Sequence, residues 1–259
     1  MTDHHCLFLS AGDGIQQERK HQQQAGNMMK ALTAIAATIY LAGTATVQAA
    51  QDNTLTAEES AAGWQLLFDG QSFTGWRNYR EKQVGDGWTI EEGAMKLAEA
   101  GGGDLISDKT WENFDFLIDW KISEAGNSGI FILADETGKY IYSHAPEIQI
   151  LDNEKAHDNK TDTHLAGSLY DMVAVHSSAS KPAGEWNTTR IKLNDNLLQV
   201  WQNGVMTTNV VIGTSTWKNL VAASKFADWE GFAANSSGHL GLQDHGNTVW
   251  FKNIKIKEL

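Results

Sequence analysis

Residues 145–154, Ala-Pro-Glu-Ile-Gln-Ile-Leu-Asp-Asn-Glu, alternate apolar and polar side chains. Such alternation is typical of a β-strand, because successive side chains point to opposite faces of the sheet. Ile148 and Ile150 would then face a core. Glu147 and Gln149 would face the other way, where a carboxylate and an amide require water or a ligand. We therefore predict a strand with one buried face and one candidate functional face, although an ordinary half-solvated sheet face fits the same pattern.

The same alternation recurs along the rest of the chain, and turn residues separate the apolar runs. Asn203-Gly204 is the signature of a type I′ hairpin turn, and a shift in apolar parity between Phe251 and Ile254 predicts a β-bulge. No helical pattern of 12 or more residues follows residue 62. Strands are predicted at 114–122, 187–193, 197–202, 205–211, 239–243 and 249–256. About a dozen short strands joined by Gly, Asn and Asp turns indicate an all-β fold, an antiparallel β-sandwich of the jelly-roll type.

One long connection interrupts this series of strands. Residues 213–236 are predicted to form a loop over one sheet, held by its own small apolar cluster. The cluster would consist of Trp217, Phe226, Trp229 and Phe232.

The N-terminal 50 residues have the composition of a targeting segment. Residues 1–27 are polar and rich in Gln and His, and we interpret them as an upstream extension from a misassigned start codon. Residues 28–50 carry a basic start, an apolar stretch and a small-x-small site, which predict a secretory signal peptide cut after Ala49 or Ala50. The expected location is periplasmic or secreted, with a membrane-anchored chain as the alternative. Residues 51–61 would be a short lead-in of one helical turn, and residues 62–259 a single domain.

The mature chain is acidic and has no cysteine. It keeps 17 basic and 29 acidic residues, a net charge of −12. A chain of this charge is not expected to bind nucleic acid or insert into an anionic membrane. Cys6 lies in the removed segment, so about 209 residues must form a core without disulfides. The sequence leaves the oligomeric state open.

All ten tryptophans lie in the mature part of the chain. A sandwich core of this size does not need ten, and exposed aromatic rings are a common means of holding the apolar faces of sugar rings. A small carbohydrate ligand is therefore expected.

A series of short motifs resembles the 3-keto-disaccharide hydrolase family, with the motifs in order over residues 62–259. They are Leu67-Phe-Asp-Gly70, Gly75-Trp76, Gly102-Gly-Asp-Leu105, Gly126-Asn-Ser-Gly-Ile-Phe131, Pro146-Glu-Ile-Gln-Ile-Leu-Asp152, Gly167-Ser-Leu-Tyr-Asp171, Gly184-Glu-Trp-Asn187, Asn203-Gly204, Ser224-Lys-Phe226, Leu242-Gln-Asp-His-Gly246 and Val249-Trp-Phe-Lys-Asn-Ile-Lys-Ile256. The resemblance implies a concanavalin-like sandwich that acts on a glycoside whose glucose C3 is a ketone.

Such a ketone acidifies the proton on C2, and its loss would let the C1 aglycone leave by elimination. Water addition would then complete a net hydrolysis. A site of this kind needs a general base near C2, an electrophile at the C3 oxygen and a proton donor for the leaving oxygen.

Four residues are candidates for the catalytic groups. Glu147 is the first choice for the base or for a metal ligand. In the turn Asp244-His245-Gly246, His245 is the better functional candidate, because a turn has no need of an imidazole. Asp152 and His157 follow the Glu147 strand. A turn-forming Asp and a surface His are the alternatives for these two residues.

A second set of residues is predicted to bind substrate. Lys225 could stabilise an enolate, although a solvated lysine is the ordinary alternative, and Asp244 could equally be a turn residue. The full set is Asn127, Ser128, Gln149, Tyr170, Lys225, Trp229, Gln243 and Asp244.

The candidate residues would also suit a divalent metal. Carboxylates with a histidine favour Ca²⁺ or Mn²⁺, and Glu147 with His157 would be the ligands. The chain contains no compact ligand loop of the Asp-x-Asp-x-Asp-Gly type, so the sequence alone does not decide the cofactor.

Two other functions remain open at this stage. The tryptophan content also fits a non-catalytic carbohydrate-binding module. Glu147-x-Gln149-x-x-Asp152 resembles the Glu-x-Asp-x-x-Glu strand of β-glucanases, but Gln149 replaces the middle Asp.

Overall fold

The computed structural model describes residues 51–98, 100–176 and 179–259, and these residues form two antiparallel β-sheets. The larger sheet contains β1 (Trp64–Leu66), β3 (Trp88–Glu91), β4 (Ala94–Leu97), β6 (Phe114–Ile122), β9 (Asn187–Asn194), β10 (Leu197–Gln202), β11 (Val205–Val211) and β13 (Val249–Glu258). The smaller sheet contains β2 (Trp76–Asn78), β5 (Leu105–Trp111), β7 (Asn127–Ala134), β8 (Glu147–Leu151) and β12 (Gly238–Leu242).

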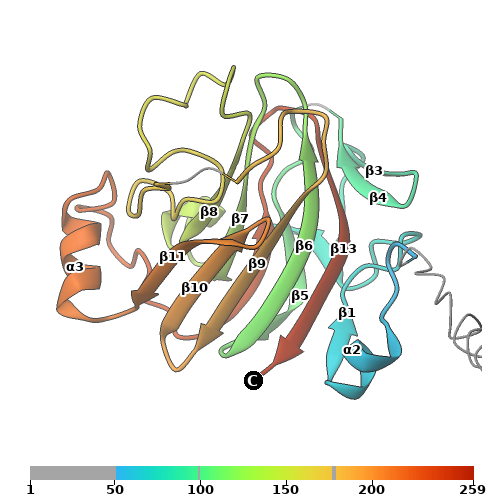
Figure 1. Cartoon of the computed structure of the whole chain (residues 1–259), viewed down its shortest axis with the longest axis horizontal. Coiled ribbons are helices and arrows are strands. Elements are labelled where there is room, and N and C mark those ends of the chain that lie inside the picture. The colour runs from blue at the N-terminus through green and yellow to red at the C-terminus, as the bar shows by residue number, and fades with distance from the viewer. Residues whose placement is uncertain (1–50, 99, 177–178) are drawn as a thin grey trace, which may run out of the picture. The chain divides into compact units, whose positions relative to one another are not determined.

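Many strands that are neighbours in a sheet are not consecutive in the sequence, as expected of a jelly roll. The larger sheet has the order β11-β10-β9-β6-β13-β4-β3, with β1 paired to β13, and the smaller has the order β2-β5-β12-β7-β8. Figure 1 shows β11, β10, β9, β6 and β13 side by side, with β8, β7 and β5 behind them. The all-β sandwich prediction is therefore confirmed.

The core between the sheets follows from the predicted alternation. Phe116, Ile118 and Trp120 of β6 are fully buried, and so are Ile148 and Ile150 of β8. They belong to one continuous apolar cluster that both sheets share. Burying these side chains is the main favourable contribution to folding.

The predicted turns and bulge are also present. Asp195 and Asn196 have φ of 49° and 66°, and Asn203 and Gly204 have φ of 47° and 82°, so both hairpins use left-handed loop residues. The register of β13 against β6 shifts between Lys252 and Lys255. The backbone N–H of the bulged residue Asn253 donates to Asn53 Oδ1 at 2.9 Å.

The lead-in contains one short helix, α2 (Ala57–Ala61), as predicted. Thr56 and Glu59 form a capping box at its N-terminus. Lys255 of β13 contacts Glu59 at 2.8 Å, so the lead-in is fastened to the larger sheet.

The prediction for residues 213–236 was wrong in two respects. The segment contains a helix, α3 (Ser215–Ala222), which Thr214 caps and which lies beside β11 in Figure 1. Trp217, Phe226 and Phe232 belong to the shared core and not to a separate cluster. A helix of eight residues is shorter than the 12-residue helical pattern on which the prediction was based. The spacing of Trp217, Leu220 and Val221 is the signal in the sequence that indicates this helix.

The predicted signal peptide lies outside the described residues. Among the residues that the structure describes, none of the helices has the length and apolar character needed to cross a membrane.

Candidate active site

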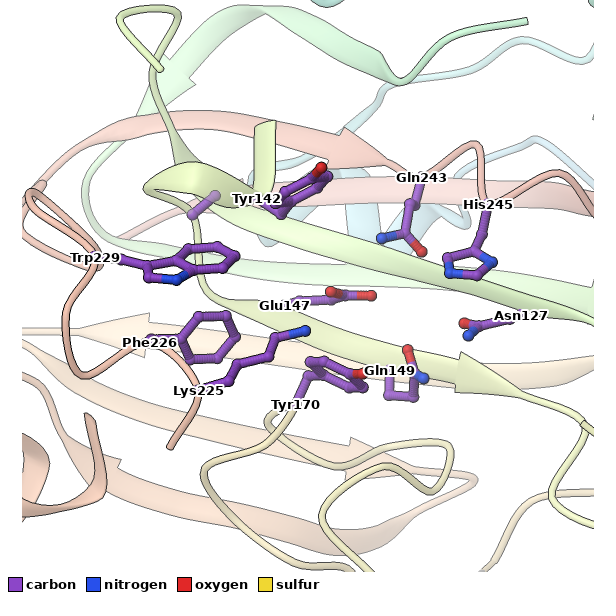
Figure 2. A pocket seen from close by; sticks show the side chains of 11 residues that line it. Asn127, Tyr142, Glu147, Gln149, Tyr170, Lys225, Phe226, Trp229, Gln243 and His245 are labelled. Atoms are coloured by element: carbon purple, nitrogen blue, oxygen red, sulfur yellow. The ribbon is translucent and has the colours of Figure 1, made fainter. Parts of the chain in front are cut away.

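A half-enclosed pocket of about 390 Å³ opens on the face of the smaller sheet that points away from the shared core. Its size is in the range of small-molecule sites, about 300–1,000 Å³. It is lined by Asn127, Tyr142, Ala145, Glu147, Gln149, Tyr170, Lys225, Phe226, Trp229, Gln243 and His245. Figure 2 shows Glu147 in the middle of this set, Trp229 and Phe226 at one end, and Asn127 and His245 at the other.

Three neighbouring strands supply the floor of the pocket. In the order β12-β7-β8, Gln243 follows β12, Asn127 begins β7, and Glu147 and Gln149 lie on β8. The backbone N–H of Gln243 donates to Gly129 O at 3.0 Å, and Gly129 pairs with Gln149. Side chains from adjacent strands therefore converge because their positions share one face of the sheet.

The predicted polar face of β8 is buried and not half-solvated. Glu147 is 8% exposed and Gln149 only 1%. The free edge of β8 is covered by residues 167–170, since Tyr170 N donates to Glu147 O at 2.9 Å and Gln149 N to Ser168 O at 3.1 Å. This covering strand-like segment also places Tyr170 beside Glu147.

Burial gives Glu147 an unusual proton affinity. Loss of solvent around the carboxyl raises the pKa of Glu147 to about 8, with the positive charge of Lys225 opposing the rise and Asp104 and Asp158 adding to it. Gln243 donates a hydrogen bond to the carboxyl. With its amide nitrogen turned toward them, Gln149 donates to Ser128 O at 3.0 Å and to Glu147 Oε1 at 3.2 Å. Glu147 is thus an ionisable group poised near neutral pH, as acid–base catalysis requires.

Lys225 and Tyr170 form one wall of the pocket. The Lys225 ammonium lies 4.2 Å from the centre of the Tyr170 ring, a cation–π contact. Figure 2 shows the ammonium group between the Glu147 carboxyl and that ring. Tyr170 donates to Asp158 Oδ2 at 2.8 Å. Burial, followed by that hydrogen bond and the nearby negative charges, raises the pKa of Tyr170, so its hydroxyl keeps its proton.

Behind this wall, His164 lies between the carboxylates of Asp158 and Asp171. His164 Nδ1 lies 2.9 Å from Asp158 Oδ1, and His164 Nε2 lies 3.0 Å from Asp171 Oδ1. Asp171 Oδ2 accepts the backbone N–H of Lys225 at 2.6 Å. The His164 ring also stacks on Tyr170, 4.5 Å between centroids. This network links both wall residues and fixes the loop that carries Lys225.

His245 stands at the rim on a rigid turn. Asp244 Oδ2 accepts the N–H groups of Gly101 and Gly103 at 3.0 and 2.8 Å, and its Oδ1 accepts Gly246 N at 2.9 Å. All three bonds are internal, so Asp244 holds the turn and does not line the pocket.

Three other predicted residues also lie outside the pocket lining. Asp152 accepts N–H groups of Ala125, Glu154 and Lys155 and so closes the turn after β8. Ser128 is on the opposite face of β7, where its hydroxyl donates to Gln243 O at 2.9 Å. His157 is exposed on a surface turn. For Asp152 and His157, these surroundings are those of a turn-forming Asp and a surface His.

The predicted metal ligands do not come together. Glu147 is buried in the pocket floor, whereas His157 is exposed and does not line the pocket. Within residues 51–98, 100–176 and 179–259, no three or more His, Cys, Asp or Glu side chains form a group that could hold a metal.

Several site residues gave no signal in the sequence. Tyr142 lies in a polar stretch before β8, and Asp158 and His164 lie among many polar residues of the 152–166 connection. Linear order does not distinguish His164 from His157, because only the folded connection turns one of them toward Tyr170. Gly129 belongs to a motif recognised in the sequence, but its role, leaving space for the Glu147 carboxyl, depends on how β7 and β8 pair.

A β-sandwich with a pocket of small-molecule size, a buried carboxyl of raised pKa and an aromatic rim fits one class of proteins, the carbohydrate-active enzymes. The profile of the 3-keto-alpha-glucoside-1,2-lyase-like domain matches residues 63–257. The chain is 36% identical over 244 residues to the 3-keto-disaccharide hydrolase of Bacteroides thetaiotaomicron, covering 82% of this chain and 84% of that protein. The chain therefore belongs to the 3-keto-alpha-glucoside-1,2-lyase-like family.

Solved structures agree with this assignment. The chain is similar to the crystal structure of a presumed glycosyl hydrolase from Parabacteroides distasonis, with a TM-score of 0.76, 32% identity, and coverage of 81% of this chain and 100% of that one. A second such structure from the same organism shares the fold, with a TM-score of 0.56, 23% identity, and coverage of 76% and 99%.

Proposed function

We propose that this protein cleaves 3-keto-glycosides by removing the C2 proton and expelling the C1 aglycone. The observation that carries the proposal is the position of Glu147, a buried carboxyl with a pKa raised to about 8, close to the ammonium group of Lys225. The family membership and the name of the B. thetaiotaomicron relative support the choice of substrate.

The steps balance without any oxidant or reductant. Glu147 takes the C2 proton, and the electrons of the C–H bond form an enolate with the C3 oxygen. The enolate then re-forms the ketone while a C1=C2 double bond appears and the C1–oxygen bond breaks. The leaving oxygen takes a proton from a donor in the site. Addition of water, with hydroxyl to C1 and hydrogen to C2, gives free 3-keto-glucose and completes a net hydrolysis.

Two nitrogen donors flank the base in this scheme. Lys225 and His245 lie on different sides of Glu147 in Figure 2. One of them would face the enolate oxygen and the other the leaving oxygen. Gln149, Gln243 and Asn127 line the same end of the pocket as His245 and would hold the sugar hydroxyls. Gln243 Oε1 is buried and has no hydrogen-bond partner among the residues that the structure describes, so it would be an acceptor for such a hydroxyl.

The experiment separates deprotonation from cleavage. In D₂O, 1,5-anhydro-3-keto-glucitol has no aglycone, so exchange at its C2 reports deprotonation alone, whereas 3-keto-trehalose and the methyl 3-keto-glucosides of both anomers report cleavage. We expect the wild type to do both and Glu147→Gln to do neither. Lys225→Met and His245→Ala each remove one of the two donors. The variant without the donor to the leaving oxygen should retain exchange but lose cleavage, and the variant without the donor to the enolate oxygen should lose both. A wild type that neither exchanges C2 nor releases any aglycone would overturn the proposal.

The alternatives have less support in this geometry. Conventional glycosidases use a pair of carboxyl groups across the scissile bond, and Glu147 is the one carboxyl among the described residues of the pocket lining. A binding module would give no reason for a buried carboxyl beside a lysine. Hydrolysis of unoxidised laminarin, or sugar binding without turnover, would favour these alternatives.

We also propose that the protein is exported, on the basis of the predicted signal peptide. Mass spectrometry of the protein made in a Gram-negative host would then give an N-terminus at Ala50 or Gln51. Recovery of the uncleaved chain in the cytoplasm would argue against export.

A further inference from the structure

A second cavity adjoins the aromatic end of the pocket. This neighbouring cavity has a volume of about 360 Å³ and is lined by Tyr140, Tyr142, Ser143, Trp229 and Glu230. Tyr142 and Trp229 line both cavities. The two spaces therefore share a wall, and a ligand longer than one sugar ring could extend from the first into the second.

The shared wall is built from exposed aromatic rings. Tyr140 and Tyr142 stack with centroids 5.0 Å apart at an angle of 13°, and Tyr142 lies 6.0 Å from Trp229 at 45°. The three residues are 45%, 37% and 36% exposed. Leaving three large rings adjacent and open to water is unfavourable unless a partner covers them. Trp229 packs edge-on against Phe226 at 5.1 Å, so its own orientation is fixed from behind.

Hydrogen bonds tie together the two segments that carry these rings. Ala233 N donates to His144 O at 2.7 Å. Asp135 accepts Asn235 Nδ2 at 3.0 Å and lies 2.9 Å from His144 Nδ1. Burial opposes ionisation of Asp135, but the bonds from Asn235 and His144 outweigh it and lower its pKa. The wall is thus preorganised, which reduces the entropic cost of binding.

The polar groups of the site lie at the opposite end. Asn127, Gln149 and His245 are remote from Trp229 in Figure 2, with Glu147 between them. Among the described residues, the side chains that line the second cavity offer Ser143, Glu230, the two tyrosine hydroxyls and the Trp229 indole N–H as polar partners, and most of its wall is aromatic. A second sugar ring would bring several hydroxyls that need hydrogen bonds, whereas a flat apolar ring needs only the aromatic faces.

We propose that Tyr142 and Trp229 form the aglycone subsite and that it takes an aromatic ring, as in aryl or arylalkyl 3-keto-glycosides. The inference rests on the proposed function, since it assigns the group that leaves. The keto-sugar would occupy the polar end, C1 and C2 would lie over Glu147, and the aromatic aglycone would pack against the exposed faces of Tyr142 and Trp229, which contact each other. Lys225, which lies between Glu147 and this end in Figure 2, would then be the donor for the leaving oxygen.

The test compares two substrates that differ only in the aromatic ring. The 2-phenylethyl and ethyl 3-keto-glucosides, in both anomers, release primary alcohols of similar acidity, so their ratio of kcat/KM reports aglycone binding and not leaving-group strength. We expect the phenylethyl compound to be preferred at least about tenfold by the wild type. Tyr142→Ala and Trp229→Ala should each reduce that ratio at least about threefold, whereas Tyr142→Phe, which keeps the ring, should preserve it. Thermal melts establish that each variant is folded.

Control measurements distinguish a failure of the aglycone subsite from a failure of the proposed function. Met206→Ala, at an exposed apolar residue of β11 outside both cavities, should leave the ratio and the absolute rates unchanged. Equal losses on both substrates in Tyr142→Ala and Trp229→Ala, or no wild-type preference for the aromatic compound, would overturn the subsite while the proposed function stands. A loss confined to 3-keto-trehalose would show that the subsite holds a sugar ring instead, which also overturns it. Failure of the wild type on every substrate would refute the proposed function and the subsite together.

Discussion

Gly129 lies directly against the carboxyl group of Glu147. A Cβ atom at position 129 would be 2.7 Å from Glu147 Cδ and 2.8 Å from Cγ, closer than side chains tolerate. Gly129 occupies β7 and pairs with Gln149 across the ladder. The missing side chain therefore creates the space in which the carboxyl of the neighbouring strand lies flat over the sheet.

The first prediction concerns this contact. Gly129 has an extended backbone without positive φ, so Gly129→Ala strains no backbone angle and acts by displacing Glu147. We expect the turnover number to fall by about 10²-fold or more, as for a misplaced general base, and stability to fall by about 1–3 kcal/mol. Gly85→Ala is the matched control, because its Cβ would meet no atom closer than 3.4 Å. Full activity in Gly129→Ala would mean that Glu147 is not the base.

The second prediction concerns stability and pH. The pKa of Glu147 rises from 4.5 to about 8 on folding, so between these values the folded chain holds a proton that the unfolded chain releases. The contribution is fully present below about pH 4.5 and is lost as the pH rises to about 8. Glu147→Gln removes this dependence and should stabilise the protein relative to wild type by on the order of 1–3 kcal/mol at pH 8.5 and little at pH 4.5. Urea unfolding at the two pH values measures it, and an identical difference at both would contradict the burial argument.

The third prediction concerns the pH profile of catalysis. If the ionised carboxylate is the base, kcat/KM should rise with pH and level off above about pH 8. Lys225→Met removes the charge that lowers the pKa of Glu147 and should move the rise to higher pH, which is followed by C2 exchange in D₂O because this variant is expected to lose cleavage. Asp104→Asn removes a charge that raises it and should move the rise to lower pH. An activity that falls above pH 8 would indicate that Glu147 acts as an acid, and shifts of both variants in the same direction would mean that the profile does not report Glu147.

The fourth prediction concerns the network behind the wall. Asp171 accepts the backbone N–H of Lys225 and contacts His164, and it has a left-handed φ of 55°. Asp171→Ala should free the loop, lower kcat/KM by about tenfold and shift the pH rise upward as Lys225 moves away. Asp171→Asn, which keeps an acceptor and tolerates the backbone conformation, should restore part of the rate. A purely structural role would lower the melting temperature without moving the pH profile.

The fifth prediction concerns the opposite face of β8. Ile148 is fully buried in the shared core, so Ile148→Ala should destabilise the protein by about 2–5 kcal/mol through the cavity it leaves. The fraction that remains folded should have a near-normal turnover number, since Ile148 does not line the pocket. Denaturant titration gives the first quantity, and rates normalised to folded protein give the second. A stable but inactive Ile148→Ala would mean that the two faces of β8 are assigned in reverse.

The elements that could be predicted from sequence are those with a local cause. Alternation along 114–122 and 145–154, left-handed Asn and Gly in the hairpins, and the parity shift near Asn253 all act within a few residues. Helix α3 was not predicted because eight residues are too few to show a clear helical pattern. Its stability comes from burial of Trp217 in the shared core.

The amino-acid sequence by itself determined the two faces of β8, the all-β fold and the choice of Glu147 as the leading acid–base candidate, because these depend on local periodicity and side-chain chemistry. Tertiary structure alone decided which polar residues surround Glu147. His164 lies against Tyr170 and His157 lies in solvent, although only seven positions separate them in one connection. Burial also raised the pKa of Glu147. Desolvation and long-range charge depend on packing between segments far apart in the chain, which no local pattern encodes.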